Sequence, residues 1–347
     1  MIELRSDTKT KPSPEMRAAI AAAEVGDEQR REDPTVNELE RRAAELLGQE
    51  EAVFVPTATM ANEIALRVLG EVGGEVVAEE NSHIFVSELG GPAVHAGLMT
   101  RPIRCPNGRF TPEQLREKVR AGDNTHTPAT RIVSVENTHN ASGARVWPLD
   151  ELEAIVETGR ELDLQLHLDG ARVLNAAVAL GVPAAEIGRR FDTVTLCLSK
   201  GLGCPLGAVV AGSPERMVTA RRFKHLFGGA MRQAGIVAAA GVYALEHNID
   251  RLAEDHARAR RLGEGLYDAG VPVDLEQVET NFVQVDVGPL GLSPEEALER
   301  LAHQGVGLSM TVHPTKLRAV THLDVDDEDI DRATELIPRA LGALARA

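Results

Sequence analysis

A lysine and an aspartate, each placed at the end of an apolar segment, stand out for their chemistry. Lys200 follows the apolar run 193–199 and precedes a glycine-rich turn. A parallel strand buries its side chains on both faces, and an unpaired ammonium buried there would destabilise the fold. A lysine at the mouth of such a strand can instead serve as an amine nucleophile. The alternative for this segment alone is a surface lysine just past a strand.

Asp169 ends a second predicted strand, in which Leu164, Leu166 and Leu168 alternate with more polar residues. In open α/β sheets, ligands bind at the carboxyl ends of the strands, so Asp169 and Lys200 would face the same edge. Pyridoxal 5'-phosphate needs these two groups: a lysine that forms a Schiff base and an acid that pairs with the pyridinium nitrogen. The alternative is that Asp169 only caps the next helix. Taken together, the pair favours the cofactor.

The composition limits the class of protein. A chain of 347 residues with 43% hydrophobic residues suggests two domains with ample core. Its net charge of −16 argues against nucleic acid or an anionic membrane as a partner. The three cysteines lack metal-ligand spacing, which indicates reduced thiols in the cytoplasm. The polar start and the lack of a long uncharged apolar run predict neither a signal peptide nor a membrane span.

Strands and helices alternate through the first two thirds of the chain. Strands are expected at 51–55, 75–78, 131–136, 165–169, 193–199 and 206–211, and helices at 35–47, 59–69, 111–120 and 148–162. Thr35 with Glu38, and Thr111 with Gln114, have the spacing of capping boxes. This alternation predicts an α/β fold with a mostly parallel sheet and helices on both faces.

From about Asp250 the pattern changes to that of an α+β unit. We expect helices at 251–269, 293–304 and 327–345, and strands at 281–287 and 316–322. The sequence therefore predicts a large cofactor-binding domain, 1–250, and a small C-terminal domain, 251–347. The N-terminal segment 1–25 is expected to line the active site.

A phosphate site is expected where a strand meets a helix at Thr57, Ala58 and Thr59. Small residues let backbone N–H groups approach an anion, and a helix start favours negative charge. His83 opens another helix, where it could stack on a pyridine ring and accept a proton; His126 and His139 invite the same reading. The alternative for each histidine is a solvent-exposed side chain.

Nine segments together resemble the low-specificity L-threonine aldolases, pyridoxal-phosphate enzymes of the aspartate-aminotransferase fold type, or fold type I. The segments are LRSDTKTKP (4–12), EDPT (32–35), FVPTATMAN (54–62), SHIF (82–85), ENTHN (136–140), HLDGAR (167–172), CLSKGLG (197–203), GGAMRQAG (228–235) and LRAVTH (317–322). The resemblance runs nearly end to end and implies a large domain with a seven-stranded type of sheet.

The resemblance also implies roles for individual residues. Lys200 is the expected Schiff-base lysine, Asp169 the partner of the pyridinium nitrogen, and His83 the residue that stacks on the ring. The remaining expected cofactor contacts are Thr57, Ala58, Thr59, Arg172, Ser199 and Arg232. The expected substrate-carboxylate contacts are Ser6, Arg172 and Arg318, the last able to clamp a carboxylate with bidentate geometry.

The implied reaction is the retro-aldol cleavage of L-threonine, L-allo-threonine or a related β-hydroxy-α-amino acid to glycine and an aldehyde. Its general base is expected to be His83 or His126. Alternatives on the same fold are a β-eliminating lyase, an aminotransferase or a non-catalytic member. The family forms homotetramers, as dimers of dimers with active sites between subunits, and Arg232 is expected to act across such an interface.

Departures from the family pattern lie before EDPT and before the glycine run. The usual tyrosine and glycine are replaced by Arg30 and Arg31, the usual lysine aligns with His225, and the third glycine is Ala230. These changes predict an altered preference for the β-substituent, toward aryl or acidic aldehydes. No ligand cluster in the sequence calls for a metal.

Overall fold

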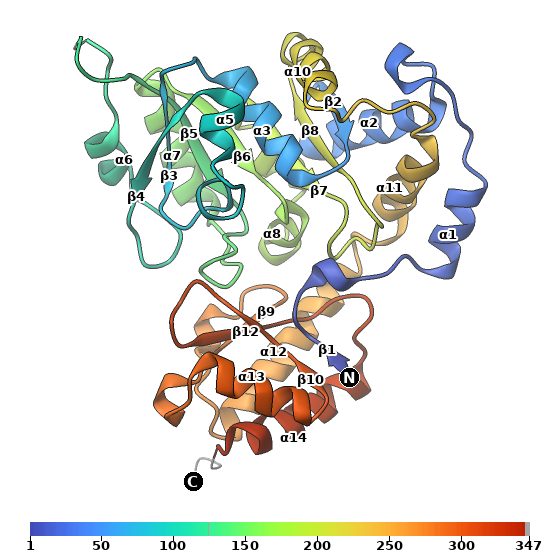
Figure 1. The fold of residues 1–347 in the computed structure, drawn as a ribbon, viewed down its shortest axis with the longest axis vertical. Coiled ribbons are helices and arrows are strands. Elements are labelled where there is room, and N and C mark those ends of the chain that lie inside the picture. Colours follow the sequence, from blue (N-terminus) through green and yellow to red (C-terminus); the bar gives the residue numbers. More distant parts are fainter. Residues whose placement is uncertain (124, 344–347) are drawn as a thin grey trace.

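A seven-stranded sheet forms the centre of the larger of two lobes (Figure 1). The computed structural model describes residues 1–123 and 125–343. Across the sheet the strands are β2 (Glu51–Val55), β8 (Ala208–Gly212), β7 (Thr193–Cys197), β6 (Gln165–Asp169), β5 (Thr130–Glu136), β3 (Glu75–Glu79) and β4 (Met99–Ile103). Strand β8 is antiparallel to both neighbours and the other pairings are parallel. The mostly parallel α/β sheet is confirmed.

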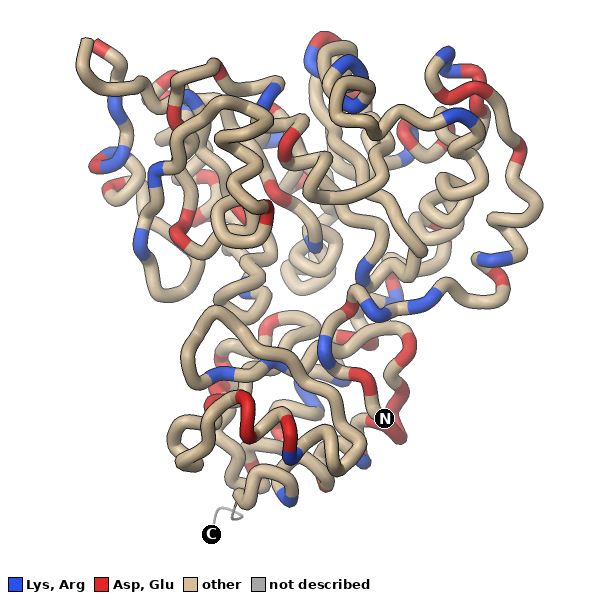
Figure 2. The backbone as a smooth tube through the Cα atoms, viewed as in Figure 1, with Lys and Arg blue, Asp and Glu red and all other residues tan. Residues whose placement is uncertain are grey.

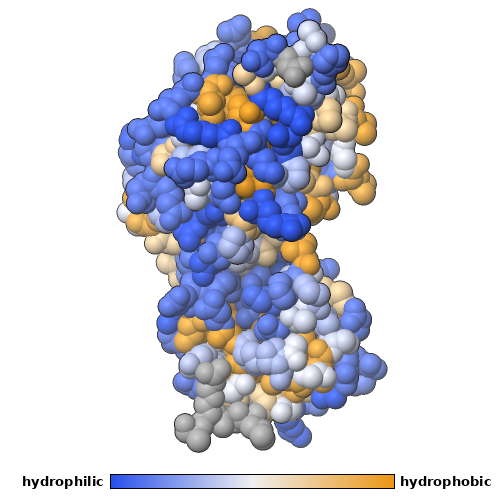
Figure 3. Space-filling model, turned by 90° about the vertical axis from the view of Figure 1, so that its left-hand side faces the viewer, coloured by the Kyte–Doolittle hydropathy of each residue, from blue (hydrophilic) through white to orange (hydrophobic). Residues whose placement is uncertain are grey.

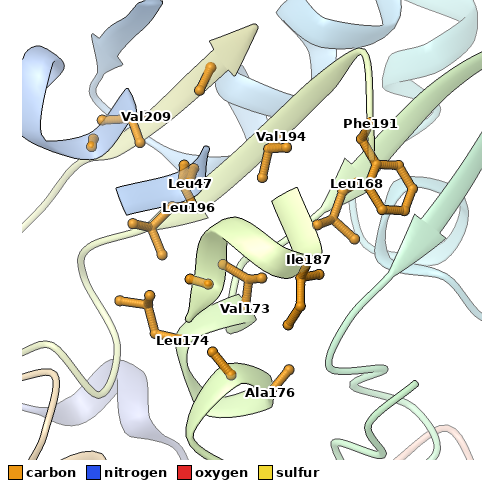
Figure 4. Packing of buried hydrophobic residues seen from close by; sticks show 14 of the residues in the cluster. Leu47, Leu168, Val173, Leu174, Ala176, Ile187, Phe191, Val194, Leu196 and Val209 are labelled. Atoms are coloured by element: carbon orange, nitrogen blue, oxygen red, sulfur yellow. The ribbon is translucent and has the colours of Figure 1, made fainter. Parts of the chain in front are cut away.

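Helices cover both faces of this sheet. One face carries α2 (Pro34–Leu47), α6 (Pro112–Lys118), α7 (Leu149–Glu161), α8 (Val173–Leu180), α9 (Ala184–Gly188) and α11 (Gly235–His247), with α1 (Pro14–Ala21) packed on α11. The other face carries α3 (Ala58–Leu69), α4 (His83–Val86), α5 (Gly91–Ala96) and α10 (Pro214–Leu226). Figure 4 shows Leu168 and Val194 of the strands against Val173 of α8 and Ile187 of α9. This packing fixes the positions of the strand ends.

The smaller lobe is built from the C-terminal elements together with the start of the chain. It contains α12 (Leu252–Asp268), β9 (Phe282–Asp286), α13 (Pro294–His303), β10 (Val306–Gly307), β11 (Ser309–Met310), β12 (Lys316–Val320) and α14 (Asp327–Leu341). Strands β11, β12 and β9 form an antiparallel sheet, and β1 (Ile2–Glu3) pairs in parallel with β10. The N-terminal segment thus starts in the small lobe and passes the junction of the lobes before it reaches α1 (Figure 1).

Two helix starts show how local sequence sets the ends of elements. The capping box predicted from Thr111 and Gln114 is confirmed at α6. The one predicted from Thr35 and Glu38 is wrong, because Asp33 caps α2 and accepts hydrogen bonds from the Thr35 and Val36 amides. Pro34 occupies the first helical position, so the cap lies at Asp33, two residues before Thr35. The predicted helix 327–345 ends at Leu341, and its positions 344 and 345 lie outside the described residues.

Lys and Arg, and Asp and Glu, are distributed along the backbone of both lobes (Figure 2). Seen from the side, the two lobes are joined by a narrower waist (Figure 3). Cys105, Cys197 and Cys204 are buried and form no disulfide. Within 1–123 and 125–343, no helix is long and apolar enough to cross a membrane.

Arg31 has a left-handed backbone conformation, with φ of 60°. A Cβ in this conformation costs roughly 1–2 kcal/mol, which glycine avoids, although glycine makes the unfolded chain more flexible. The Arg31 side chain is exposed. We therefore expect Arg31→Gly to raise the free energy of unfolding by about 0.5–1 kcal/mol, measured by urea denaturation.

The neighbouring residue gives a matched control. Arg30 is also exposed but lies in the short 3-10 helix η2 (Glu28–Arg30), without a left-handed φ. Arg30→Gly should lower the free energy of unfolding, because it adds flexibility without relieving strain. An equal loss of stability in both variants would contradict the strain argument.

Candidate active site

The carboxyl ends of β5, β6 and β7 bring together the acids and the amine of the candidate site. Asp169 is the last residue of β6 and pairs in register with Thr195 of β7. Lys200 follows the end of β7 by three residues and is half-buried. Glu136 ends β5 and pairs in register with Asp169. The adjacent strand ends therefore place Asp169 and Lys200 at one edge of the sheet.

Asp169 is held from two sides. Its Oδ2 accepts a hydrogen bond of 2.9 Å from the Asn62 amide, and its Oδ1 accepts one of 3.2 Å from the Ala171 backbone N–H. The second amide hydrogen of Asn62 goes to Oε1 of Glu88, also at 2.9 Å. The Asn62 oxygen accepts from Thr195 at 2.9 Å, which orients the amide. Asn62 therefore fixes the relative positions of the Asp169 and Glu88 carboxylates.

His83 stands at the start of α4, beside these acids. Its Nδ1 lies 2.7 Å from Oε1 of Glu88, and its backbone N–H donates to Oε2 of Glu136 at 2.6 Å. Ligand-type atoms of His83, Glu88 and Asp169 all lie within 4.8 Å of one another. Burial alone would lower the pKa of His83, but the carboxylates of Glu88, Asp169 and Glu136 outweigh it and raise that pKa. The ring therefore keeps its proton to a higher pH than an ordinary histidine.

Arg172 is fully engaged by an acid of the N-terminal segment. Its Nε and Nη2 donate to the two carboxylate oxygens of Asp7, each at 2.7 Å, and both side chains are buried. Burial would raise the pKa of Asp7, but the charges of Arg172, Lys200 and Arg318 hold it well below its usual range. The charges of all three cations therefore act on Asp7. The guanidinium of Arg172 already forms a bidentate ion pair with this carboxylate.

Arg318 differs from Arg172 in its partners. Its Nε donates to the Ser309 hydroxyl at 3.0 Å and its Nη1 to the Asn140 side-chain oxygen at 2.9 Å. Its guanidinium lies 5.3 Å from the centre of the Phe282 ring. Among the described residues no carboxylate forms an ion pair with it. Burial and the nearby charge of Arg172 lower its pKa, with Asp7 acting in the opposite direction. Arg318 can therefore receive an external carboxylate.

The turn between β2 and α3 has the features of an anion site. Thr57 caps α3 by accepting a hydrogen bond from the Met60 backbone N–H at 3.1 Å, and Thr57 and Thr59 are exposed while Ala58 is half-buried. The glycine-rich loop after α10 packs against this turn: a Cβ on Gly229 would come within 2.3 Å of the Met60 sulfur. Backbone N–H groups at such a helix start favour a phosphate.

The remaining expected contacts lie near the site with local partners. The Ser6 hydroxyl accepts a hydrogen bond from the Thr8 backbone N–H at 3.2 Å, directly before Asp7. Ser199 is half-buried, next to Lys200, and its hydroxyl lies 3.5 Å from the Cys197 sulfur.

Two expected site residues lie apart from this edge within one chain. His126 is exposed on the turn before β5, at the amino end of that strand, and the seven residues of β5 span roughly 20 Å. Arg232 is exposed and forms an ion pair of 3.3 Å with Asp27. His139 is buried instead, with its Nε2 2.9 Å from Glu79.

Three of the departures from the family pattern, Arg31, His225 and Ala230, line one surface cavity of about 270 Å³. Its other lining residues are Glu28, Gln29, Arg221, Arg222 and Lys224. Lys224 is buried at its base and forms an ion pair with Glu28, whose other oxygen accepts from the Met231 backbone N–H at 2.9 Å. The pair ties the segment before α2 to the loop that follows α10.

Four further residues of the site are not indicated by the sequence patterns: Asp7, Asn62, Glu88 and Glu136. Three of them lie inside the quoted segments LRSDTKTKP, FVPTATMAN and ENTHN. Their side chains act on other side chains of the site, so nothing in their local spacing indicates a role. Their contacts appear only once the strands are paired.

The chain is similar to a known family and to a known protein over most of its length. The family model described as beta-eliminating lyase matches residues 3–288. A low specificity L-threonine aldolase of Escherichia coli K12 is 41% identical over 332 residues, covering 95% of this chain and 96% of its own length.

Two solved structures show the same fold. A threonine aldolase of Leishmania major superposes with a TM-score of 0.84 at 20% identity, covering 98% of this chain and 99% of that one. Several structures of SPT with PLP superpose with TM-scores of 0.73 to 0.75. The high-resolution one has a TM-score of 0.74 at 18% identity and covers 98% of this chain and 88% of that one.

Proposed function

The chain belongs to the beta-eliminating lyase family and to the low-specificity L-threonine aldolases, and from that premise we propose that it cleaves β-hydroxy-α-amino acids. L-threonine and L-allo-threonine are the first expected substrates, and glycine and acetaldehyde the products. The observation that carries this proposal is the placement of Lys200 beside Asp169 at adjacent strand ends, with Arg318 approaching from the other lobe.

Pyridoxal 5'-phosphate is the proposed cofactor, and the residues present fit it. An acid at one strand end, an amine at the next and an exposed threonine turn at a helix start match its ring nitrogen, its aldehyde and its phosphate. Lys200 would anchor it, Asp169 would keep its ring nitrogen protonated, and the turn from Thr57 to Thr59 would hold its phosphate. When bound, it supplies an electron sink for the electron pair of a bond that breaks at Cα.

The substrate carboxylate is assigned to Arg318. Its guanidinium is bonded to the neutral oxygens of Ser309 and Asn140, so a carboxylate can bind without displacing an acid. We propose that Arg172 acts differently from the family expectation, by holding Asp7 and shaping the positive field of the cleft. A carboxylate fixed by Arg318 orients the Cα–Cβ bond, which determines the bond that breaks.

The chain must also take one proton from the β-hydroxyl and return one to Cα. Loss of the hydroxyl proton allows the Cα–Cβ bond to break and the aldehyde to leave, and protonation of Cα then gives glycine. We propose that the unprotonated ring of His83 takes the hydroxyl proton and then returns a proton to Cα, because Glu88 fixes this ring in place. A positioned general base contributes typically about 10²–10⁴-fold. His126 remains the second candidate and would enter the site from another subunit.

A homotetramer built from close dimers is part of the same proposal. Leu89 and Val94, next to and on α5, and Leu226, at the end of α10, are exposed apolar residues. His95 and Phe227 connect them, with ring centroids 4.7 Å apart. A partner on this surface would bring its Arg232 or His126 to the site. Sedimentation velocity would test the assembly, and a monomer would refute it.

Cytoplasmic location belongs to the proposal as well, supported by three buried free thiols. Cell fractionation would test it, and recovery in a secreted fraction would refute it.

The function is tested by measuring acetaldehyde and glycine released from L-threonine and, separately, from L-allo-threonine by the purified protein with added pyridoxal phosphate. Release of both products in equal amounts supports the aldolase. Pyruvate with ammonia would indicate a β-eliminating lyase, and a keto acid an aminotransferase. Equal turnover of threonine, allo-threonine and phenylserine would contradict the altered β-substituent preference expected from Arg30, Arg31 and His225.

A further inference from the structure

A second carboxyl group lies behind the acid that holds His83. Glu63 of α3 and Glu88, which follows α4, are 3% and 5% exposed. Oε1 of Glu88 accepts hydrogen bonds from Asn62 and His83. In contrast, Oε2 of Glu88 and both carboxyl oxygens of Glu63 are buried and lack a hydrogen-bond donor among the residues described. A buried polar atom without a partner is costly, so these three oxygens require an explanation.

The carboxyl group of Glu63 lies within hydrogen-bonding reach of that of Glu88. Burial, followed by the hydrogen bond and charge of Glu88, raises the pKa of Glu63 to about 9. On its other side the Glu63 carboxyl meets the backbone of α5: a Cβ on Gly91 would lie 1.8 Å from Oε1. The packing of α3 against α5 therefore places Glu63 beside the segment that carries Glu88, whose carbonyl accepts a hydrogen bond from the Gly91 N–H.

Charged groups around the pair do not neutralise Glu63. Of the two carboxyl groups of the pair, only that of Glu88 contacts the His83 ring. Asp169 and Glu136, at the ends of β6 and β5, add negative charge near His83. Arg67, one turn along α3, donates to the Ala96 carbonyl and lies over the Phe223 ring. On α5, His95 packs against Phe227, whose ring belongs to the segment after α10. None of the ion pairs among the described residues includes Glu63.

Two neighbouring buried carboxylates cannot both be ionised at moderate cost, so one proton is retained between them. As two carboxylates, Glu63 and Glu88 offer only acceptors. One proton on Glu63 creates a donor, and an O–H···O bond then satisfies oxygens on both residues. Glu88 keeps its negative charge, which its bonds from Asn62 and His83 require.

We propose that Glu63 is a positioning residue that keeps a proton at neutral pH, donates it to Oε2 of Glu88, and so holds the Glu88 carboxylate against Nδ1 of His83. This inference rests on the proposed function, because that function gives His83 its role in proton transfer. Its tests use proton binding and the state of the His83 ring, so they can fail independently of turnover.

The first test is the pH dependence of stability. Between the ordinary carboxyl pKa of 4.5 and about 9, folded protein holds a proton that the unfolded chain has released. The free energy of unfolding of the wild type should therefore fall as pH rises through this interval. Glu63→Gln keeps a hydrogen-bond donor but has no titrating group at this position. The difference between its melting temperature and that of the wild type should therefore shift in favour of the variant as pH rises from about 5 to about 9.

The control is Glu157→Gln, which removes an exposed glutamate on α7 and should follow the wild type at each pH. Calorimetry in buffers of different ionisation enthalpy should also show that, near neutral pH, unfolding of the wild type releases about one proton more than unfolding of Glu63→Gln. Equal proton release by the wild type and Glu63→Gln would overturn the protonated Glu63.

The second test follows His83 itself in holoenzyme labelled with ¹⁵N-histidine. Glu63→Leu removes the donor that holds Glu88 in place, so the Glu88 carboxylate is no longer fixed against Nδ1 and should stabilise the His83 imidazolium less. The titration midpoint of His83 should then fall by about half a unit or more, while Glu63→Gln stays near the wild type. Equal midpoints in all three proteins would overturn the positioning role.

Discussion

Lys200→Ala should abolish threonine cleavage, with a loss of kcat on the order of 10⁴-fold or more, the size typical of removing a nucleophile that acts covalently. The lysine is the only proposed covalent link to the cofactor, and it stands at the mouth of β7 beside Asp169. Alanine leaves the phosphate turn and the Asp169 contacts intact, so weak cofactor binding should persist. The measurements are acetaldehyde release and the visible absorbance of the protein after dialysis.

Lys118→Ala on α6 is the matched control, because it removes a half-buried lysine far from the carboxyl edge of the sheet. It should retain both the turnover and the absorbance of the wild type. Retention of cofactor absorbance after dialysis and borohydride treatment of Lys200→Ala would show that another residue anchors the cofactor.

Arg318→Leu should lower kcat/KM for L-threonine by roughly 10²–10³-fold, equivalent to about 3–4 kcal/mol for a lost bidentate, charge-assisted contact. Most of the loss should appear in KM, because the carboxylate is present in both the ground state and the transition state. The guanidinium is held by Ser309 and Asn140, so it is already oriented for this contact. Steady-state kinetics with L-threonine and L-allo-threonine measure the effect.

Arg300→Leu on α13 controls for loss of an arginine in the same lobe, since Arg300 is exposed and pairs with Glu296. It should leave kcat/KM near the wild-type value. Arg172 is a poor choice for this question, because its removal would leave Asp7 buried without its partner and should cost about 3–5 kcal/mol of stability. If Arg318→Leu kept a wild-type KM, the substrate carboxylate would have to bind elsewhere.

The local sequence determined those elements whose whole signal lies within the element. Strands 51–55 and 165–169 have the predicted bounds, because the apolar run of the first and the leucine alternation of the second each lie within the strand itself. The capping box of Thr111 and Gln114 was likewise predicted, because its two residues lie only three positions apart in the sequence. Strand β4 was missed: it is an edge strand of partly exposed residues that include Pro102, and its pairing with β3 defines it.

The sequence also indicated the edge at which the site lies, since Asp169 and Lys200 each follow a strand and parallel strands end at a common edge. Only the tertiary structure decided what each side chain does there. Residues 165 positions apart form the Asp7–Arg172 pair, and Glu63 meets Glu88 across the packing of α3 against α5. Such contacts depend on burial and on partners from other elements, which determine whether an arginine is occupied or free and whether a carboxyl group keeps its proton.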